Sequence, residues 1–109
     1  TEPTPPRSDA CANAAEETAL TACRVKQFRG IERQRVLAEQ KRLTMAQDDQ
    51  ELQASIKEAA AAWVAFRGAE CKVLTSENRG SGFDAYWNYC LVRLTEQRLV
   101  DLSKNADLP

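Results

Sequence analysis

An all-α fold, a small antiparallel three-helix bundle with disulfides at one end, is predicted by three features of this 109-residue chain. Helix-forming residues dominate from residue 16 to residue 72, and apolar residues recur there at steps of three and four. The sequence contains no alternating run of β-branched residues that would indicate a strand. Four cysteines lie near the expected helix ends. The length suits a single domain.

The two ends of the chain are expected to lie outside the helical domain, which we assign to residues 11–105. The opening sequence is rich in proline and polar residues, so residues 1–10 are expected to form an extended linker, and residues 106–109 a short tail. A start such as Thr1 is typical of a mature exported protein or of a lipoprotein cut after its anchor cysteine, although an arbitrary cut would begin in the same way. No apolar run approaches the ~18 residues of a membrane span.

The first helix is expected at about residues 14–46. Its apolar stripe is ragged and consists of Leu20, Cys23, Phe28, Ile31, Val36 and Leu43. Glu16 and Glu17 lie near its amino end, where acidic side chains suit the helix dipole.

The middle helix has the clearest pattern. Asp48 and Glu51 predict a capping box at its start. Steps of four, three, four and three then predict one buried stripe, formed by Leu52, Ile56, Ala59, Trp63 and Phe66.

The last helix follows a glycine-bearing loop and is also expected to have a capped start and one apolar face. Ser81 or Asp84 is expected to cap its start. One face is predicted to be buried, with Trp87, Leu91, Leu94 and Leu102 on it and Leu99 close by. Three helices with short connections run up, down and up, which places all four cysteines at one end.

An even number of cysteines in a small domain favours disulfides and an oxidising compartment. Zinc sites usually contain close cysteine pairs, but the separations here are wide and the chain has no histidine. Four cysteines allow three connectivities. We expect Cys71–Cys90, because the chain reverses between them, and Cys11–Cys23, which requires the segment before about residue 16 to fold back.

The charge pattern gives little sign of a charged partner. The net charge is −1, so nucleic acid is not an expected partner. Residues 24–42 are mainly basic and residues 48–58 mainly acidic. The simplest interpretation is two solvated helix faces that attract each other.

Catalysis is not expected from this composition. Without histidine no Ser-His-Asp or Cys-His arrangement can form, and disulfide-bonded cysteines are not nucleophiles. Glu70 and Asp84 could form a carboxylate pair, but we expect Asp84 to cap a helix and Glu70 to pair with Arg67 or Arg98. The glycines do not form a phosphate-binding fingerprint, and no metal or cofactor is expected.

The second half of the chain resembles the LprI-type lysozyme-inhibitor domain. The motifs are AWVAFRGAEC, a loop with RGSG, and YCLVRLTEQRLVDL. The matching positions are Trp63, Phe66, Arg67, Ala69, Glu70 and Cys71, then Gly80, Ser81, Cys90, Leu91, Leu94, Thr95, Arg98 and Leu102. The first half agrees more loosely, through Cys11, Cys23 and Phe28. It departs from the family pattern at Ile31, Glu32, Arg35, Val36 and Glu39, and the family's double glycine is split as Gly80 and Gly82.

The resemblance implies an all-helical domain of exported bacterial envelope proteins. Lysozyme inhibition is attributed to a member, and related domains look suited to act as immunity proteins against enzymes delivered by rivals. The implied partner is therefore a secreted or envelope-acting enzyme, such as a lysozyme-like hydrolase or a phospholipase toxin. The location is the periplasm or cell envelope, with membrane contact only through an N-terminal lipid anchor. The alternative is a structural or accessory envelope domain.

Two groups of residues are candidates for the contact surface. The family match points to Trp63, Arg67, Glu70 and Arg98, but Trp63 continues the apolar stripe, so we expect these residues, with Phe66 and Trp87, to be structural. The expected recognition surface is the glycine-bearing loop that the Cys71–Cys90 disulfide closes. Glycines allow close backbone approach, and aromatic and amide groups suit contacts with a partner. The residues of this surface are Asn78, Arg79, Gly80, Ser81, Gly82, Phe83, Tyr86 and Asn88.

Overall fold

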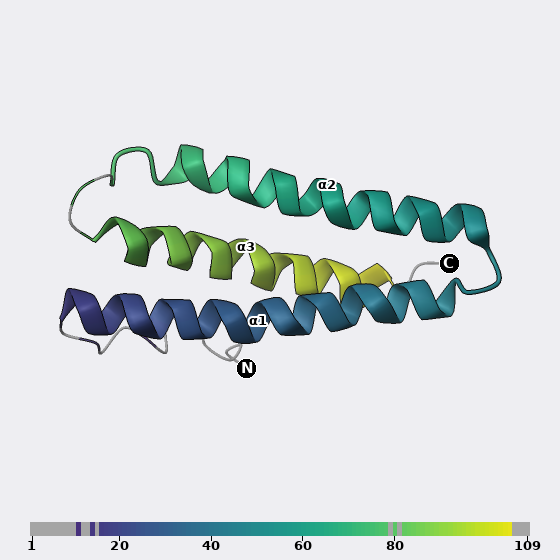
Figure 1. Ribbon diagram of the computed structural model, residues 1–109, viewed down its shortest axis with the longest axis horizontal. Helices are drawn as coiled ribbons and strands as arrows, with labels where there is room; N and C mark the ends of the chain where they lie inside the picture. Colours follow the sequence, from purple (N-terminus) through teal and green to yellow (C-terminus); the bar gives the residue numbers. More distant parts are fainter. Residues whose placement is uncertain (1–10, 12–13, 15, 79, 81, 106–109) are drawn as a thin grey trace.

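The computed structural model describes residues 11, 14, 16–78, 80 and 82–105, and confirms the all-α fold. Helix α1 spans Glu17–Met45, α2 spans Gln50–Leu74 and α3 spans Phe83–Asn105. Figure 1 shows α1 and α3 running in one direction and α2 in the other. No described helix is long and apolar enough to cross a membrane. The linker and tail expected at residues 1–10 and 106–109 lie outside the described residues.

The start of α2 corrects the predicted capping box. Asp49, not Asp48, is the N-cap, and its side chain accepts a hydrogen bond from the backbone N–H of Leu52 at 2.9 Å. This bond satisfies one of the unpaired amides of the first turn. The preceding turn is further fixed by Gln53, whose amide donates to the carbonyl of Leu43 in α1 at 3.0 Å. The position expected for a Ser81 cap on α3 lies outside the described residues.

Both disulfides lie at the end where α1 begins, α2 ends and α3 begins, and we call this the stapled end (Figure 1). The pairs are Cys11–Cys23 and Cys71–Cys90, each with 5.8 Å between the Cα atoms. Cys11 is therefore folded back beside the second turn of α1, as the expected pairing requires. The Cys71–Cys90 bridge links α2 to α3 and is part of the main apolar cluster, together with Leu91.

The three helices are not equally close. In Figure 1, α3 lies beside α1 along much of its length, and α2 packs more loosely against this pair. The predicted face of α3 is largely correct, since Leu91 and Leu102 are buried and Trp87 and Leu94 pack against the apolar cluster. A second pair on α3, Val92 and Thr95, is completely buried and was not predicted.

The predicted stripe of α2 is only partly correct. Ile56 is buried and Trp63 is half-buried, but Leu52 and Phe66 keep 47% and 52% of their surface exposed, and Ala59 is exposed. The helix is instead rotated so that its inner face includes Arg67 and Cys71. The disulfide at Cys71 and the ion pair of Arg67 with α1 fix this rotation. The ragged stripe of α1 is wrong at Val36, which is exposed.

Candidate functional site

A network of charged side chains forms the centre of the bundle. Arg67 of α2 donates to Glu32 of α1 through both terminal nitrogens, at 2.7 and 3.1 Å, and to the hydroxyl of Thr95 in α3 at 3.0 Å. Arg98 of α3 donates to both oxygens of Glu39 of α1 at 3.0–3.1 Å. Arg35, between the two acids on α1, bonds to both of them. All three helices are thus joined by charge-assisted hydrogen bonds.

Trp63 lies among these guanidinium groups rather than in an apolar core. The centroid of its ring is 4.8 Å from the guanidinium carbon of Arg67, 5.5 Å from that of Arg35 and 5.7 Å from that of Arg98. Such distances allow cation–π attraction. The ring and the ion pairs therefore support one another, which fits the structural role predicted for Trp63, Arg67 and Arg98, although the chemistry of the contact is different from that expected.

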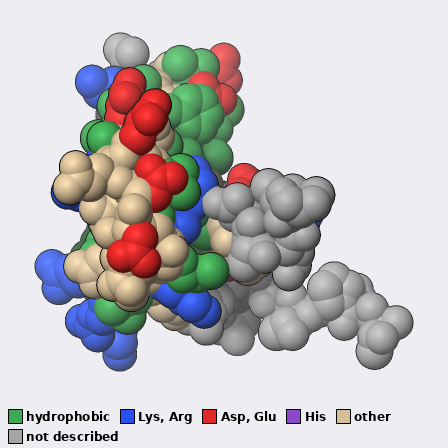
Figure 2. Space-filling model, turned by 90° about the vertical axis from the view of Figure 1, so that its right-hand side faces the viewer, with side chains coloured by type: hydrophobic (Ala, Val, Ile, Leu, Met, Phe, Trp, Pro, Cys, Tyr) green, Lys and Arg blue, Asp and Glu red, His purple; other side chains and the backbone are tan. Residues whose placement is uncertain are grey.

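The network also corrects two predictions about charge. Glu70 was expected to pair with Arg67 or Arg98, but these arginines bond to Glu32 and Glu39 of α1. The acids that join the helices are thus members of the mainly basic stretch 24–42, and the arginines come from the other two helices. Many other charges are solvated, as expected. Figure 2 looks onto the end where α1 turns into α2 and shows carboxylates in its middle and Lys or Arg side chains toward its lower edge.

The position of Glu32 strongly favours its ionised form. Burial alone would raise its pKa, but hydrogen bonds from Arg35 and Arg67 and the attraction of both guanidinium groups lower the pKa from 4.5 to about 2. The same contacts raise the pKa of Arg35, chiefly through its hydrogen bond to Glu32. Glu32 consequently stays ionised at neutral pH, where it accepts the hydrogen bonds of Arg35 and Arg67.

The residues expected to form the recognition surface do not all face solvent. Tyr86 is 52% exposed. Phe83 instead stacks on Trp87, with 6.1 Å between ring centroids, and the amide of Asn88 donates to the carbonyl of Asp84 on its own helix at 2.9 Å. Asn78 is half-buried and Gly80 is exposed. Arg79 and Ser81 lie outside the described residues.

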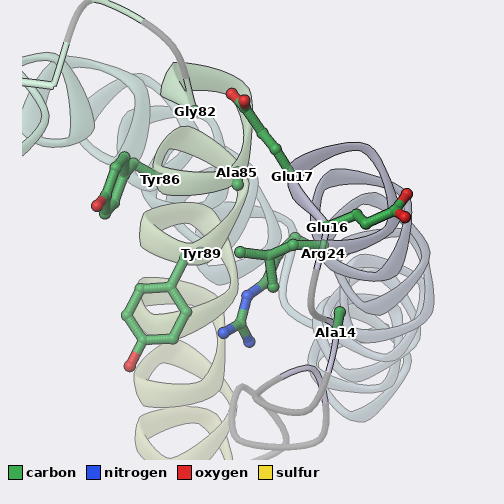
Figure 3. Close-up of a pocket in the computed structure, with 9 residues that line it drawn as sticks. Ala14, Glu16, Glu17, Arg24, Gly82, Ala85, Tyr86 and Tyr89 are labelled. Carbon is green, nitrogen blue, oxygen red and sulfur yellow. The ribbon is translucent and has the colours of Figure 1, made fainter.

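A groove of about 430 Å³ at the stapled end includes Tyr86 and Gly82 among its walls. It lies between the start of α1 and the start of α3 (Figure 3). The residues that line it are Ala14, Glu16, Glu17, Leu20, Arg24, Gly82, Ala85, Tyr86 and Tyr89. The groove combines two tyrosines and one arginine, residue types that are enriched at protein contact surfaces, with two glutamates.

Arg24 and Tyr89 form the fixed part of this groove. The guanidinium of Arg24 lies 4.5 Å from the centroid of the Tyr89 ring, and Figure 3 shows it extending from α1 toward α3. Its Nη1 also donates to the side-chain oxygen of Gln27 at 3.2 Å. Arg93 is close to the same ring, at 5.8 Å, and donates to the Tyr89 hydroxyl at 3.3 Å. These contacts hold the Tyr89 ring in place beside the exposed Tyr86.

Gly82 permits the close approach of the two helix starts. Its φ is +85°, in the region that favours glycine, and α3 begins at the next residue. A Cβ at this position would lie 3.4 Å from the carboxylate of Glu17 and 3.7 Å from the ring of Tyr86. Gly82 and Tyr86 are among the residues predicted to contact a partner. Arg24 and Tyr89, which also line the groove, are not, because the groove joins segments that are far apart in the chain.

A larger groove, of about 630 Å³, lies at the opposite end of the bundle. Its walls are mostly aliphatic and include Met45, Leu52, Ile56, Leu99 and Leu102. It contains none of the residues predicted to contact a partner and no aromatic side chain. The groove at the stapled end is therefore the better candidate for recognition.

Within the described residues, no cluster of three or more Cys, Asp or Glu side chains could hold a metal ion.

The fold and the two disulfides define a small, disulfide-bonded, all-helical domain. A comparison with protein families matches residues 8–102 to the family described as "Lysozyme inhibitor LprI", and the chain belongs to this family. The resemblance of the sequence motifs is thereby confirmed, and the family is one of inhibitors rather than of enzymes. Comparisons with curated proteins and with solved structures find no match.

Proposed function

We propose that this protein is an exported bacterial inhibitor or immunity protein that binds and neutralises a cell-envelope-degrading enzyme and carries out no chemistry itself. Membership of a lysozyme-inhibitor family supports this function. The two disulfides favour an oxidising location, and we place the protein in the periplasm or cell envelope. A lysozyme-like hydrolase is the first candidate target, and another peptidoglycan hydrolase or a phospholipase toxin is the next.

The exposed Tyr86 beside a groove at the stapled end is the observation that carries the proposal. Both disulfides lie at this end, so the surface around the groove is more rigid than a loop of the same length would be without them. A rigid surface loses less conformational entropy on binding. Tyrosine contributes a large contact area with few rotatable bonds, and it is enriched among the residues that dominate binding energies.

The charges around the groove indicate the kind of surface that it would contact. Glu16 and Glu17 lie at the start of α1. Figure 3 shows the carboxylate of Glu17 at the rim beside Gly82 and that of Glu16 pointing away from α3, whereas the guanidinium of Arg24 extends between the two helices, against Tyr89. A basic segment of the enzyme would complement this rim. Arg79, predicted from the sequence as a contact residue, lies outside the described residues and would add a further charged contact.

Titration of a lysozyme, and then of other envelope hydrolases, against the disulfide-bonded protein tests this proposal. Tyr86→Ala and Arg79→Ala should each weaken binding by more than about 1 kcal/mol without changing the melting curve. Val100→Ala is a matched control, because Val100 is exposed to a similar extent on α3 but lies near the opposite end. Binding that survives both changes would place the interface elsewhere. Failure to bind any hydrolase would favour an accessory envelope domain.

A further inference from the structure

Helix α2 leaves a continuous row of apolar and small side chains exposed along its outer side. Three large members, Leu52, Phe66 and Val73, keep 47%, 52% and 65% of their surface exposed. The complete row, which we call the α2 seam, is Leu52, Ser55, Ala59, Ala62, Phe66, Ala69 and Val73, and all seven are exposed. Isolated exposed apolar residues need no explanation, but a continuous row of this kind does.

The spacing of the α2 seam indicates a helix as its partner. Successive members are three and four residues apart in strict alternation, which is the spacing of the a and d positions of a coiled coil. Side chains at this spacing lie on one face of a helix, and such a face can pack along the length of a second helix. The inner side of α2, with Ile56 and Trp63, already faces the rest of the bundle, so the α2 seam is a second helix-packing face.

The charges beside the α2 seam favour a particular partner and orientation. Its outer border carries Glu51 and Glu58 near the start of α2, then Ala65, and then Lys72 near the end, and all four are exposed. Glu58 and Lys72 are each seven residues from Ala65. Suppose that a second copy of α2 lies antiparallel to the first, with a two-fold axis near Ala65. Glu58 of the first copy would then face Lys72 of the second, and Lys72 of the first copy would face Glu58 of the second. A parallel arrangement would place this border of the two copies on opposite sides of the α2 seam, so Glu58 and Lys72 could not pair.

We propose that the α2 seam is the interface of an antiparallel homodimer formed by a second copy of this chain. The row spans about 32 Å at 1.5 Å per residue. One helix face of this length lies at the small end of specific interfaces, so the dimer forms reversibly and at high protein concentration. This surface is separate from the stapled-end groove, which stays accessible in the dimer. The inference does not depend on the identity of the target enzyme.

Sedimentation velocity of the disulfide-bonded protein over a concentration series tests the proposal. We expect a monomer–dimer equilibrium that Lys72→Glu weakens about tenfold, because two attractive pairs become repulsive. The double variant Glu58→Lys/Lys72→Glu should recover the wild-type dissociation constant. Phe66→Glu should abolish the dimer, whereas Val100→Glu, which also places a charge on an exposed apolar position, should leave it unchanged. Circular dichroism melts establish that each variant is folded.

Three results would overturn the homodimer. The first is a wild-type protein that stays monomeric throughout the series. The second is a dimer that tolerates both Phe66→Glu and Lys72→Glu, which would place the interface on another surface. The third is a monomer whose binding to an envelope hydrolase is lost in Phe66→Glu and kept in Val100→Glu, which would assign the α2 seam to a helix of the target.

Discussion

Arg67 and Glu32, 35 residues apart in the chain, form a two-pronged ion pair that joins α2 to α1, with N–O distances of 2.7 and 3.1 Å. The Arg67 side chain is nearly buried and that of Glu32 is about a quarter exposed. Because α2 packs more loosely than the other two helices, this pair and the Cys71–Cys90 disulfide determine much of its position. The stability of the bundle should therefore depend on Glu32.

Glu32→Gln should lower the free energy of unfolding by about 2–3 kcal/mol. The change keeps the shape of the side chain but removes the charged partner of Arg67 and one of the two charged partners of Arg35, which keeps Glu39. Urea unfolding followed by circular dichroism measures the effect. Glu77→Gln, at an exposed position in the loop after α2, is the control and should change the value by less than about 0.5 kcal/mol. Equal effects of the two changes would contradict a central role for the Arg67–Glu32 pair.

The pH dependence of stability should identify the same carboxylate. The pKa of Glu32 is lowered from 4.5 to about 2 in the folded protein, so its ionised form stabilises the fold. This contribution is complete above the unfolded pKa and is lost as the pH falls from about 4.5 toward about 2. The difference in unfolding free energy between wild type and Glu32→Gln should thus be constant near neutral pH and shrink in acid. A difference that stays constant down to about pH 3 would contradict the assignment.

The fold was more accessible from the sequence than the interior of the bundle. Helix formers, apolar spacing and the cysteine positions predicted three helices and the stapled end correctly. They did not identify Glu32 and Glu39 as the acids that pair with Arg67 and Arg98, because hydropathy patterns assign acidic side chains to the surface. One signal was present in the chain: Glu32, Arg35 and Glu39 are three and four residues apart, so they share one helix face, and the two acids interrupt a basic stretch.

The candidate groove was only partly predictable for a different reason. Tyr86 and Gly82 belong to a local motif beside the loop, and local motifs can be read from the chain. Arg24 contacts Tyr89 across two helices, and that contact depends on the relative rotation of α1 and α3. Apolar spacing gives the approximate inward face of each helix but does not determine which side chains meet at its edges.

Trp63→Ala should destabilise the protein by about 3–5 kcal/mol, the range for removal of a large aromatic side chain from a packed position. Trp63→Leu separates the two contributions of the ring, since leucine retains much of the apolar volume but has no aromatic face for the three guanidinium groups. We expect Trp63→Leu to cost at least about 1 kcal/mol in urea melts. A loss below about 1 kcal/mol for Trp63→Ala would instead indicate a surface residue and make Trp63 a candidate for partner binding.

Gly82 and Gly80 provide a matched pair of substitutions in the loop before α3. Gly82→Ala should cost about 1–2 kcal/mol, because alanine disfavours a φ of +85° and its Cβ would lie 3.4 Å from the Glu17 carboxylate. A Cβ at Gly80 would meet only open space, so Gly80→Ala should be neutral or slightly stabilising through the unfolded state. Thermal and urea melts of the two variants give the comparison. If Gly82→Ala were as stable as Gly80→Ala, the close approach of the helix starts at the groove would not depend on glycine.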